Sequence, residues 1–124
     1  MPNRYAAVLA LALAMLSGPQ ALAHGEAKPR RGGTAVMAND IGFELVGTPG
    51  GVAIYLDDHG KPLAPRGFSG KLAVLVGTEK SEAGLVPAGD RLEARGLRLA
   101  PGARAVATLT LPEGKVITVR FAIR

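Results

Sequence analysis

The chain has 124 residues, a formal net charge of +5, two histidines, and neither cysteine nor tryptophan. Without cysteine there can be no disulfide, no thiolate metal site and no lipid-modified cysteine. Lys and Arg are scattered singly apart from a short basic group at residues 28–31, and few aromatic residues accompany them, so the composition argues against a nucleic-acid-binding surface. No Ser-His-Asp arrangement and no phosphate-binding glycine loop occurs, so we expect no enzyme.

The first 23 residues have the pattern of a secretory signal peptide. Arg4 precedes the apolar run Ala6–Leu16, which is well short of the about 20 residues that a membrane-spanning helix needs. The small-x-small sequence Ala21–Ala23 then supplies a signal-peptidase site. We therefore predict cleavage after Ala23, a periplasmic mature protein that begins at His24, and no stable membrane insertion after cleavage. The alternative is an uncleaved membrane anchor.

Residues 24–33 (HGEAKPRRGG) are polar, contain one proline and three glycines, and show no periodicity. This composition predicts a flexible polar arm. From Thr34 onward the pattern changes to short runs that alternate between apolar and polar residues. Because the rest of the chain keeps this pattern, residues 34–124 are expected to form one β domain.

Turn signals containing Gly, Pro, Asn or Asp separate the apolar runs about every ten residues. No segment shows a helical stripe of ten or more residues. The runs predict eight strands: Thr34–Ala38, Phe43–Val46, Val52–Asp57, Lys71–Val76, Ser81–Val86, Arg91–Ala94, Ala103–Leu111 and Lys115–Ile123.

The last two of these runs carry the clearest alternation. A short Pro-Glu-Gly loop at residues 112–114 joins them into a hairpin, and a period of two puts one apolar face inward and one polar face outward. Together with the number and spacing of the strands, this predicts an all-β fold, an antiparallel immunoglobulin-like β-sandwich of about 7–8 short strands. The inward face of the last strand would consist of Ile117, Val119, Phe121 and Ile123.

Three residues form a candidate metal site. An N-terminal His24 would offer its α-amine and its ring Nδ1 to one ion. Asp57 and His59 are two residues apart, so on an extended strand they would face the same side. An amine, two imidazoles and a carboxylate suit Cu(II), which binds nitrogen and oxygen ligands tightly.

The same residues allow a simpler interpretation. Asp57–Pro62 has the composition of a polar hairpin turn, in which Gly60 supplies a positive φ and His59 is merely solvated. His24 would then belong to an arm that binds nothing. We keep both interpretations open.

Two resemblances bear on the choice. His24, Asp57 and His59 resemble the N-terminal-His plus Asp-x-His site of periplasmic copper carriers of the CopC type. Over most of the mature chain, the sequence is similar to short, mostly uncharacterised proteobacterial periplasmic proteins. It is also similar to the N-terminal segment of periplasmic adaptor subunits of heavy-metal efflux pumps. The segments that carry the wider resemblance are Gly42–Val46, Ile54–Pro62, Gly70–Leu75 and Val119–Phe121.

The wider resemblance implies a connection to metal stress. Our leading expectation is a non-enzymatic periplasmic accessory or binding protein in metal homeostasis, with Cu(II) as the candidate metal and a metal-efflux or other envelope complex as the candidate partner. The alternative is an envelope protein–protein interaction module without a metal ligand.

Overall fold

The computed structural model describes residues 27–124, and in this range the chain forms nine antiparallel β-strands and no helix. Accordingly, the described residues contain no helix long and apolar enough to cross a membrane. The strands are β1 (Thr34–Ala38), β2 (Ile41–Thr48), β3 (Gly51–Asp58), β4 (Lys61–Leu63), β5 (Ser69–Val76), β6 (Glu79–Ala88), β7 (Arg91–Arg95), β8 (Arg104–Thr110) and β9 (Val116–Ala122).

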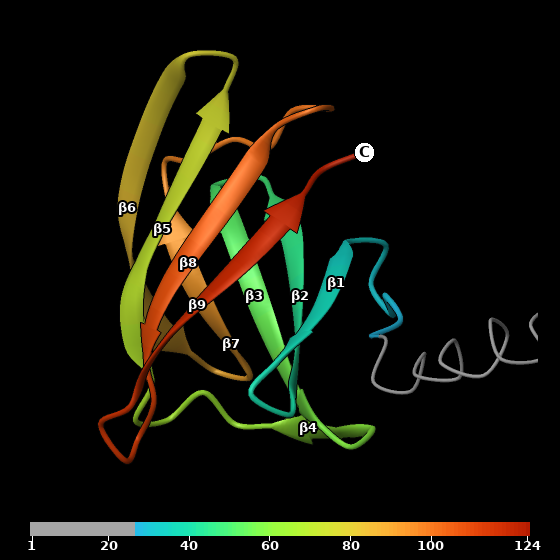
Figure 1. The fold of residues 1–124 in the computed structure, drawn as a ribbon, viewed down its shortest axis with the longest axis vertical. Coiled ribbons are helices and arrows are strands. Elements are labelled where there is room, and N and C mark those ends of the chain that lie inside the picture. The colour runs from blue at the N-terminus through green and yellow to red at the C-terminus, as the bar shows by residue number, and fades with distance from the viewer. Residues whose placement is uncertain (1–26) are drawn as a thin grey trace, which may run out of the picture.

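The strands follow one continuous path in the order β1-β2-β3-β7-β6-β5-β8-β9, with β4 attached to β3. Figure 1 shows two layers, with β5, β8 and β9 crossing in front of β2, β3 and β7. Strand β6 joins the layers, because Glu79–Leu85 pairs with β5 and Val86–Ala88 pairs with β7. The end strands β1 and β9 approach each other, so the sheet is nearly closed. The predicted antiparallel all-β fold is confirmed. One continuous path of paired strands forms both layers.

Each of the eight predicted strands is present, with ends that differ by a few residues. The sequence did not predict β4, because three residues are too few to show alternation. Turn residues explain the tight connections. Asn39 and Asp40 both have positive φ (52° and 62°) between β1 and β2, as a two-residue hairpin turn requires.

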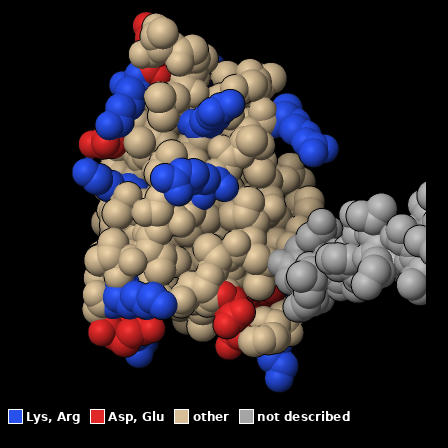
Figure 2. Space-filling view, in the orientation of Figure 1, with Lys and Arg blue, Asp and Glu red and all other residues tan. Residues whose placement is uncertain are grey.

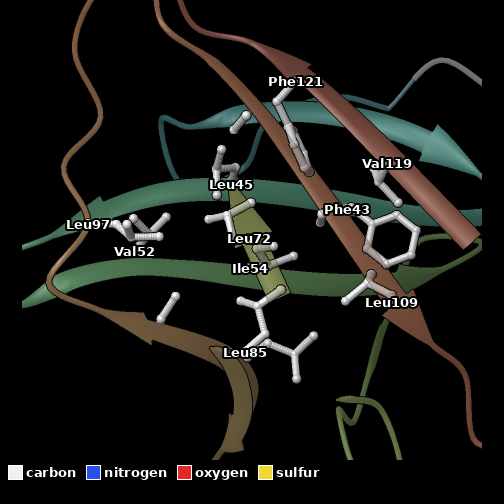
Figure 3. Close-up of a cluster of buried hydrophobic side chains, with 14 of the residues drawn as sticks. Phe43, Leu45, Val52, Ile54, Leu72, Leu85, Leu97, Leu109, Val119 and Phe121 are labelled. Carbon is white, nitrogen blue, oxygen red and sulfur yellow. The ribbon is translucent and has the colours of Figure 1, made fainter. Parts of the chain in front are cut away.

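The core lies between the two layers and is built from the alternating apolar residues of nearly every strand. On β9, Val119 and Phe121 are buried while Arg120 between them is exposed, so the predicted orientation of this strand is confirmed. Ile117 and Ile123 pack at the margin of the core and are partly buried. Figure 3 shows side chains from both layers pointing toward one another, among them Phe43, Leu45, Ile54, Leu72, Leu109, Val119 and Phe121.

Candidate metal centre

The outer face of β1, β2 and β3 carries the residues of interest. Met37 pairs with Gly42, Gly42 pairs with Asp57, and Asp57 pairs with Pro62 of β4, so these positions form one row across the strands. Gly42 has no side chain, and a Cβ placed there would lie 3.3 Å from both Cβ and Oδ2 of Asp57. The glycine therefore leaves open space beside the Asp57 carboxylate.

This open space is part of a pocket of ≈330 Å³, which we call the Asp57 pocket. Its walls come from the outer face of β1–β3, from the turn between β3 and β4, and from the residues that precede β1. Lining residues include Ala27, Arg30, Met37, Asp57, His59 and Pro62. Two of the three predicted ligands thus border one pocket.

Only one oxygen of the Asp57 carboxylate accepts a hydrogen bond among the described residues. Oδ2 accepts a hydrogen bond from the backbone N–H of Gly60 at 3.1 Å. Oδ1 is buried and has no hydrogen-bond partner among the described residues. Because buried polar atoms are nearly always paired with protein or water, Oδ1 is an exception among the described residues.

His59 lies in the turn and not on the strand. Strand β3 ends at Asp58, and His59 has a φ of +52°, so the extended spacing that placed Asp57 and His59 on one face is wrong at His59. Its ring is exposed (83%), and Nδ1 lies 2.6 Å from Oδ1 of Asp58. Since a carboxylate accepts, Nδ1 is the nitrogen that holds the proton in this pair, and Nε2 is left free.

The third predicted ligand, His24, lies outside the described residues. Within residues 27–124, no three His, Cys, Asp or Glu side chains gather closely enough to hold a metal ion. Ala27, however, borders the Asp57 pocket, and only two residues separate it from His24 in the sequence. Three residues of extended chain span up to about 10 Å, which is the length of chain between Ala27 and His24.

A second carboxylate on the same face, Glu44 of β2, has a different environment. It is 6% exposed and accepts hydrogen bonds from the backbone N–H groups of Arg30 (3.0 Å), Arg31 (2.8 Å) and Gly33 (2.9 Å). This part of the predicted flexible arm is therefore fastened to the sheet. Glu44 was not among the predicted site residues, although a single carboxylate within the apolar run Gly42–Val46 was a visible signal.

Arginine side chains complete the attachment of the arm. The Arg31 guanidinium lies over the Tyr55 ring, 3.8 Å from its centroid, and Arg30 Nη1 donates to the carbonyl of Gly60 at 3.1 Å. Desolvation by burial raises the pKa of Glu44, but the three backbone hydrogen bonds and the Arg31 charge outweigh it. The net effect is a pKa below the ordinary value of 4.5. Glu44 is thus held as a carboxylate.

The basic side chains of the visible face do not gather into one stripe. Figure 2 shows Lys and Arg spread singly over the layer of β5, β8 and β9.

Comparison with known proteins gives no family: the chain matches no family model, no curated protein and no solved structure. The resemblances to copper carriers and to efflux adaptor subunits therefore stay predictions.

Proposed function

We propose that this protein is a non-enzymatic periplasmic Cu(II)-binding protein of metal homeostasis, with His24, Asp57 and His59 as ligands. One observation supports this above all. Asp57, whose Oδ1 has no hydrogen-bond partner among the described residues, borders a pocket that is also lined by His59 and by Ala27, which is three positions after His24. A carboxylate, an imidazole and the described residue that lies three positions after His24 thus border one pocket.

The ligand chemistry suits Cu(II). An N-terminal His24 gives an amine and a ring nitrogen in one chelate, and Asp57 adds an oxygen. The Asp58 carboxylate that holds Nδ1–H of His59 leaves Nε2 for the metal. A carboxylate on the far ring nitrogen is the usual partner of a metal-bound histidine, because it fixes the tautomer and makes the ring more basic. Three nitrogens and an oxygen match the tetragonal preference of Cu(II).

Lys28, Arg30 and Arg31 line the same pocket, and the two arginines contact other groups. Arg30 donates to the Gly60 carbonyl, and Arg31 is stacked on Tyr55 beside Glu44. Against these stand the carboxylates of Asp57 and Asp58. Neither arginine makes a hydrogen bond or ion pair with the Asp57 carboxylate in the structure.

The proposal requires export and processing. Residues 1–23 act as the signal peptide, and cleavage after Ala23 creates the α-amine of His24. The intact mass of the protein from a periplasmic extract should match residues 24–124. A full-length mass in the membrane fraction would contradict the processing, and with it the N-terminal chelate.

Calorimetric titration with CuCl₂ tests the site directly. Placing one Ala before His24 removes the amine–imidazole chelate, and His59→Ala removes the second imidazole, so both should weaken binding strongly. The loss of binding free energy in the double variant should be much smaller than the sum of the two single losses, because both changes dismantle one site. Asp57→Asn should weaken binding less, since only one oxygen changes.

Asp90→Asn in the exposed turn between β6 and β7 is the matched control and should bind as the wild type does. A free α-amine must lose its proton to bind Cu(II), so affinity should fall as the pH drops below about 8. Unchanged affinity in the extended variant or in His59→Ala would overturn the proposed site.

A second candidate function is an envelope interaction module, and the end strands favour it. Strands β1 and β9 are the two ends of the sheet path, and a hollow of ≈840 Å³ beside them is lined by residues of both strands, Arg120 among them. An unpaired strand edge can accept an extended segment of a partner. Absence of Cu(II) binding, together with an envelope partner that is lost on Arg120→Glu, would favour this function over the first.

A further inference from the structure

We propose that the cleft between β1 and β9 binds an extended acidic segment of another protein, which adds as a strand to the free edge of β9. The cleft is the hollow of ≈840 Å³ that is lined by Thr34 and Val36 on one side and by Arg120 and Ala122 on the other. We call it the β1–β9 cleft. The inference does not depend on Cu(II). It rests on the second candidate function and gives that function a partner of stated chemistry.

The cleft is closed at one end and open at the other. Lys115 Nζ donates a hydrogen bond to Oδ1 of Asn39 at 2.8 Å, which joins the chain just before β9 to the chain just after β1. The hollow is lined instead by the start of β1 and the end of β9. In Figure 1 these two segments lie at the same end of the molecule, near the C-terminus. An entering segment would therefore approach from this end.

Backbone groups of β9 face the cleft without a partner strand. Strand β9 pairs only with β8. The carbonyl of Lys115 and the N–H of Ile123 bond the residues that flank β8, at 2.8 Å and 2.9 Å. Bonded and non-bonded residues alternate along an antiparallel pair, so the odd-numbered residues of β9 bond β8. Arg120 and Ala122 therefore direct their N–H and C=O groups into the cleft, where an added strand can pair with them.

The floor of the cleft is apolar. Val36, Leu99 and Ile123 line it, and all three are partly buried against the core. Successive side chains of an added strand would point to opposite faces of the sheet. One set would contact this floor and the other set would lie beside Arg120 on the outer face. The cleft thus fits a segment in which every second residue is apolar.

The charge of the cleft selects the remaining residues of the segment. Arg120 and Arg124 line the cleft and are exposed, and no Asp or Glu occurs among the described residues that line it. Opposite charges on neighbouring strands stabilise a sheet, whereas like charges destabilise it. Acidic side chains beside Arg120 would therefore be favoured, and basic ones would be disfavoured.

A second free strand edge in the molecule has a different composition. Residues Glu79–Leu85 of β6 pair with β5 alone. This edge carries Glu79, Lys80 and Glu82, which are exposed charges of both signs. Charged side chains on an edge strand discourage pairing with other chains. The β1–β9 cleft, with its apolar floor and one sign of charge, is the better docking edge.

An acetylated and amidated hexapeptide of alternating valine and glutamate is the probe. It is titrated into the isotope-labelled mature protein in buffer with EDTA, and the amide resonances are followed by NMR. The signals of Arg120 and Ala122, whose N–H groups face the cleft, should shift more than those of Val119 and Phe121, which bond β8. A valine–lysine hexapeptide should not bind, and neither should a valine–glutamate hexapeptide with methylated backbone nitrogens.

Two variants separate the charge from the backbone edge. Arg120→Glu should weaken binding of the valine–glutamate peptide at least about tenfold, because it reverses the charge beside the peptide. Ala122→Pro removes an N–H that faces the cleft and leaves the β8 pairing, as proline on an edge strand can, so it should also weaken binding at least about tenfold. Arg95→Glu, an exposed residue of β7 that does not line the cleft, is the control and should bind as the wild type does.

Equal binding of the valine–lysine peptide would overturn the acidic partner, and binding of the methylated peptide would overturn strand addition. Unshifted Arg120 and Ala122 signals at millimolar peptide would overturn the proposal. A dimer of the protein that is lost in Ala122→Pro, without peptide binding, would assign the edge to a second copy. An envelope partner that binds both β9 variants as it binds the wild type would overturn this edge but keep an interaction function. None of these outcomes bears on Cu(II) binding, which is measured separately.

Discussion

Glu44 and Asp57 project from the same outer face of neighbouring strands, yet their environments are opposite. Glu44 accepts hydrogen bonds from three backbone N–H groups, so both of its oxygens are paired. Asp57 accepts one hydrogen bond from a backbone N–H group, and its buried Oδ1 has no hydrogen-bond partner among the described residues. A fully paired carboxylate contributes to the fold, and an open one is available to a ligand. Stability and metal affinity should therefore respond differently to changes at the two positions.

The largest effect should come from the core that supports both carboxylates. Phe121→Ala removes a buried aromatic side chain and should lower the free energy of unfolding by about 3–5 kcal/mol. Arg120→Ala, on the exposed side of the same strand, should change it by less than about 0.5 kcal/mol. Urea denaturation followed by circular dichroism measures both. Similar losses from the two variants would contradict the orientation of β9.

The comparison itself is tested by two substitutions of the same kind. Glu44→Gln should lower the free energy of unfolding by about 1–3 kcal/mol, because backbone donors of the arm lose their acceptor. Asp57→Asn should change it by less than about 0.5 kcal/mol, since Oδ1 has no hydrogen bond to lose and Gly60 N–H keeps an acceptor. Denaturation at pH 7 and constant ionic strength gives both values. A greater loss in Asp57→Asn would remove the distinction between the two carboxylates.

Lowering the pH should remove the stabilising contribution of Glu44. The folded-state pKa of Glu44 lies below its unfolded value of about 4.5, so its stabilising contribution is present above that pH and is lost as the pH falls through the folded pKa. The difference in stability between wild type and Glu44→Gln should therefore be constant near pH 7 and shrink below about pH 4.5. Denaturation curves of both proteins between pH 7 and pH 3 measure it. A difference that grows in acid would be inconsistent with the depressed pKa.

The smallest effect should come from a solvated carboxylate. Glu82 of β6 pairs with Lys80 at 3.3 Å, but both side chains are exposed (43% and 60%). Exposed ion pairs contribute about 0–1 kcal/mol, so Glu82→Gln should lie within about 0.5 kcal/mol of wild type. A loss as large as that of Glu44→Gln would show that burial and backbone donors are not what distinguishes Glu44.

The alternation of apolar and polar residues was sufficient to predict most of the strands but little of the candidate site. The alternation of apolar and polar residues in β8 and β9 predicts which side chains are buried, and the structure confirms it. It could not report that β6 passes from one layer to the other, because Glu79–Ala88 shows no sign of changing partners. Burial patterns are local, whereas the choice of partner strand depends on the whole chain.

The site depends on contacts that composition does not encode. The partners of Glu44 are backbone N–H groups 11 to 14 residues earlier, and every residue except proline has such a group. At His59, a single positive φ changed the direction of the side chain. Asp57 and His59 border one pocket although the spacing argument was incorrect, because a tight turn also brings neighbouring residues together.

Recognition of the arm through its backbone has a consequence for sequence variation. The hydrogen bonds to Glu44 come from amide groups, so any residue except proline can supply them at positions 30 and 31, although arginine there adds the contacts with Gly60 and Tyr55. Glu44 and Gly33 have no such freedom, since one supplies the only acceptor and the other the space for close approach. Related chains should therefore retain this distant glutamate–glycine pair more strictly than the basic residues of the arm.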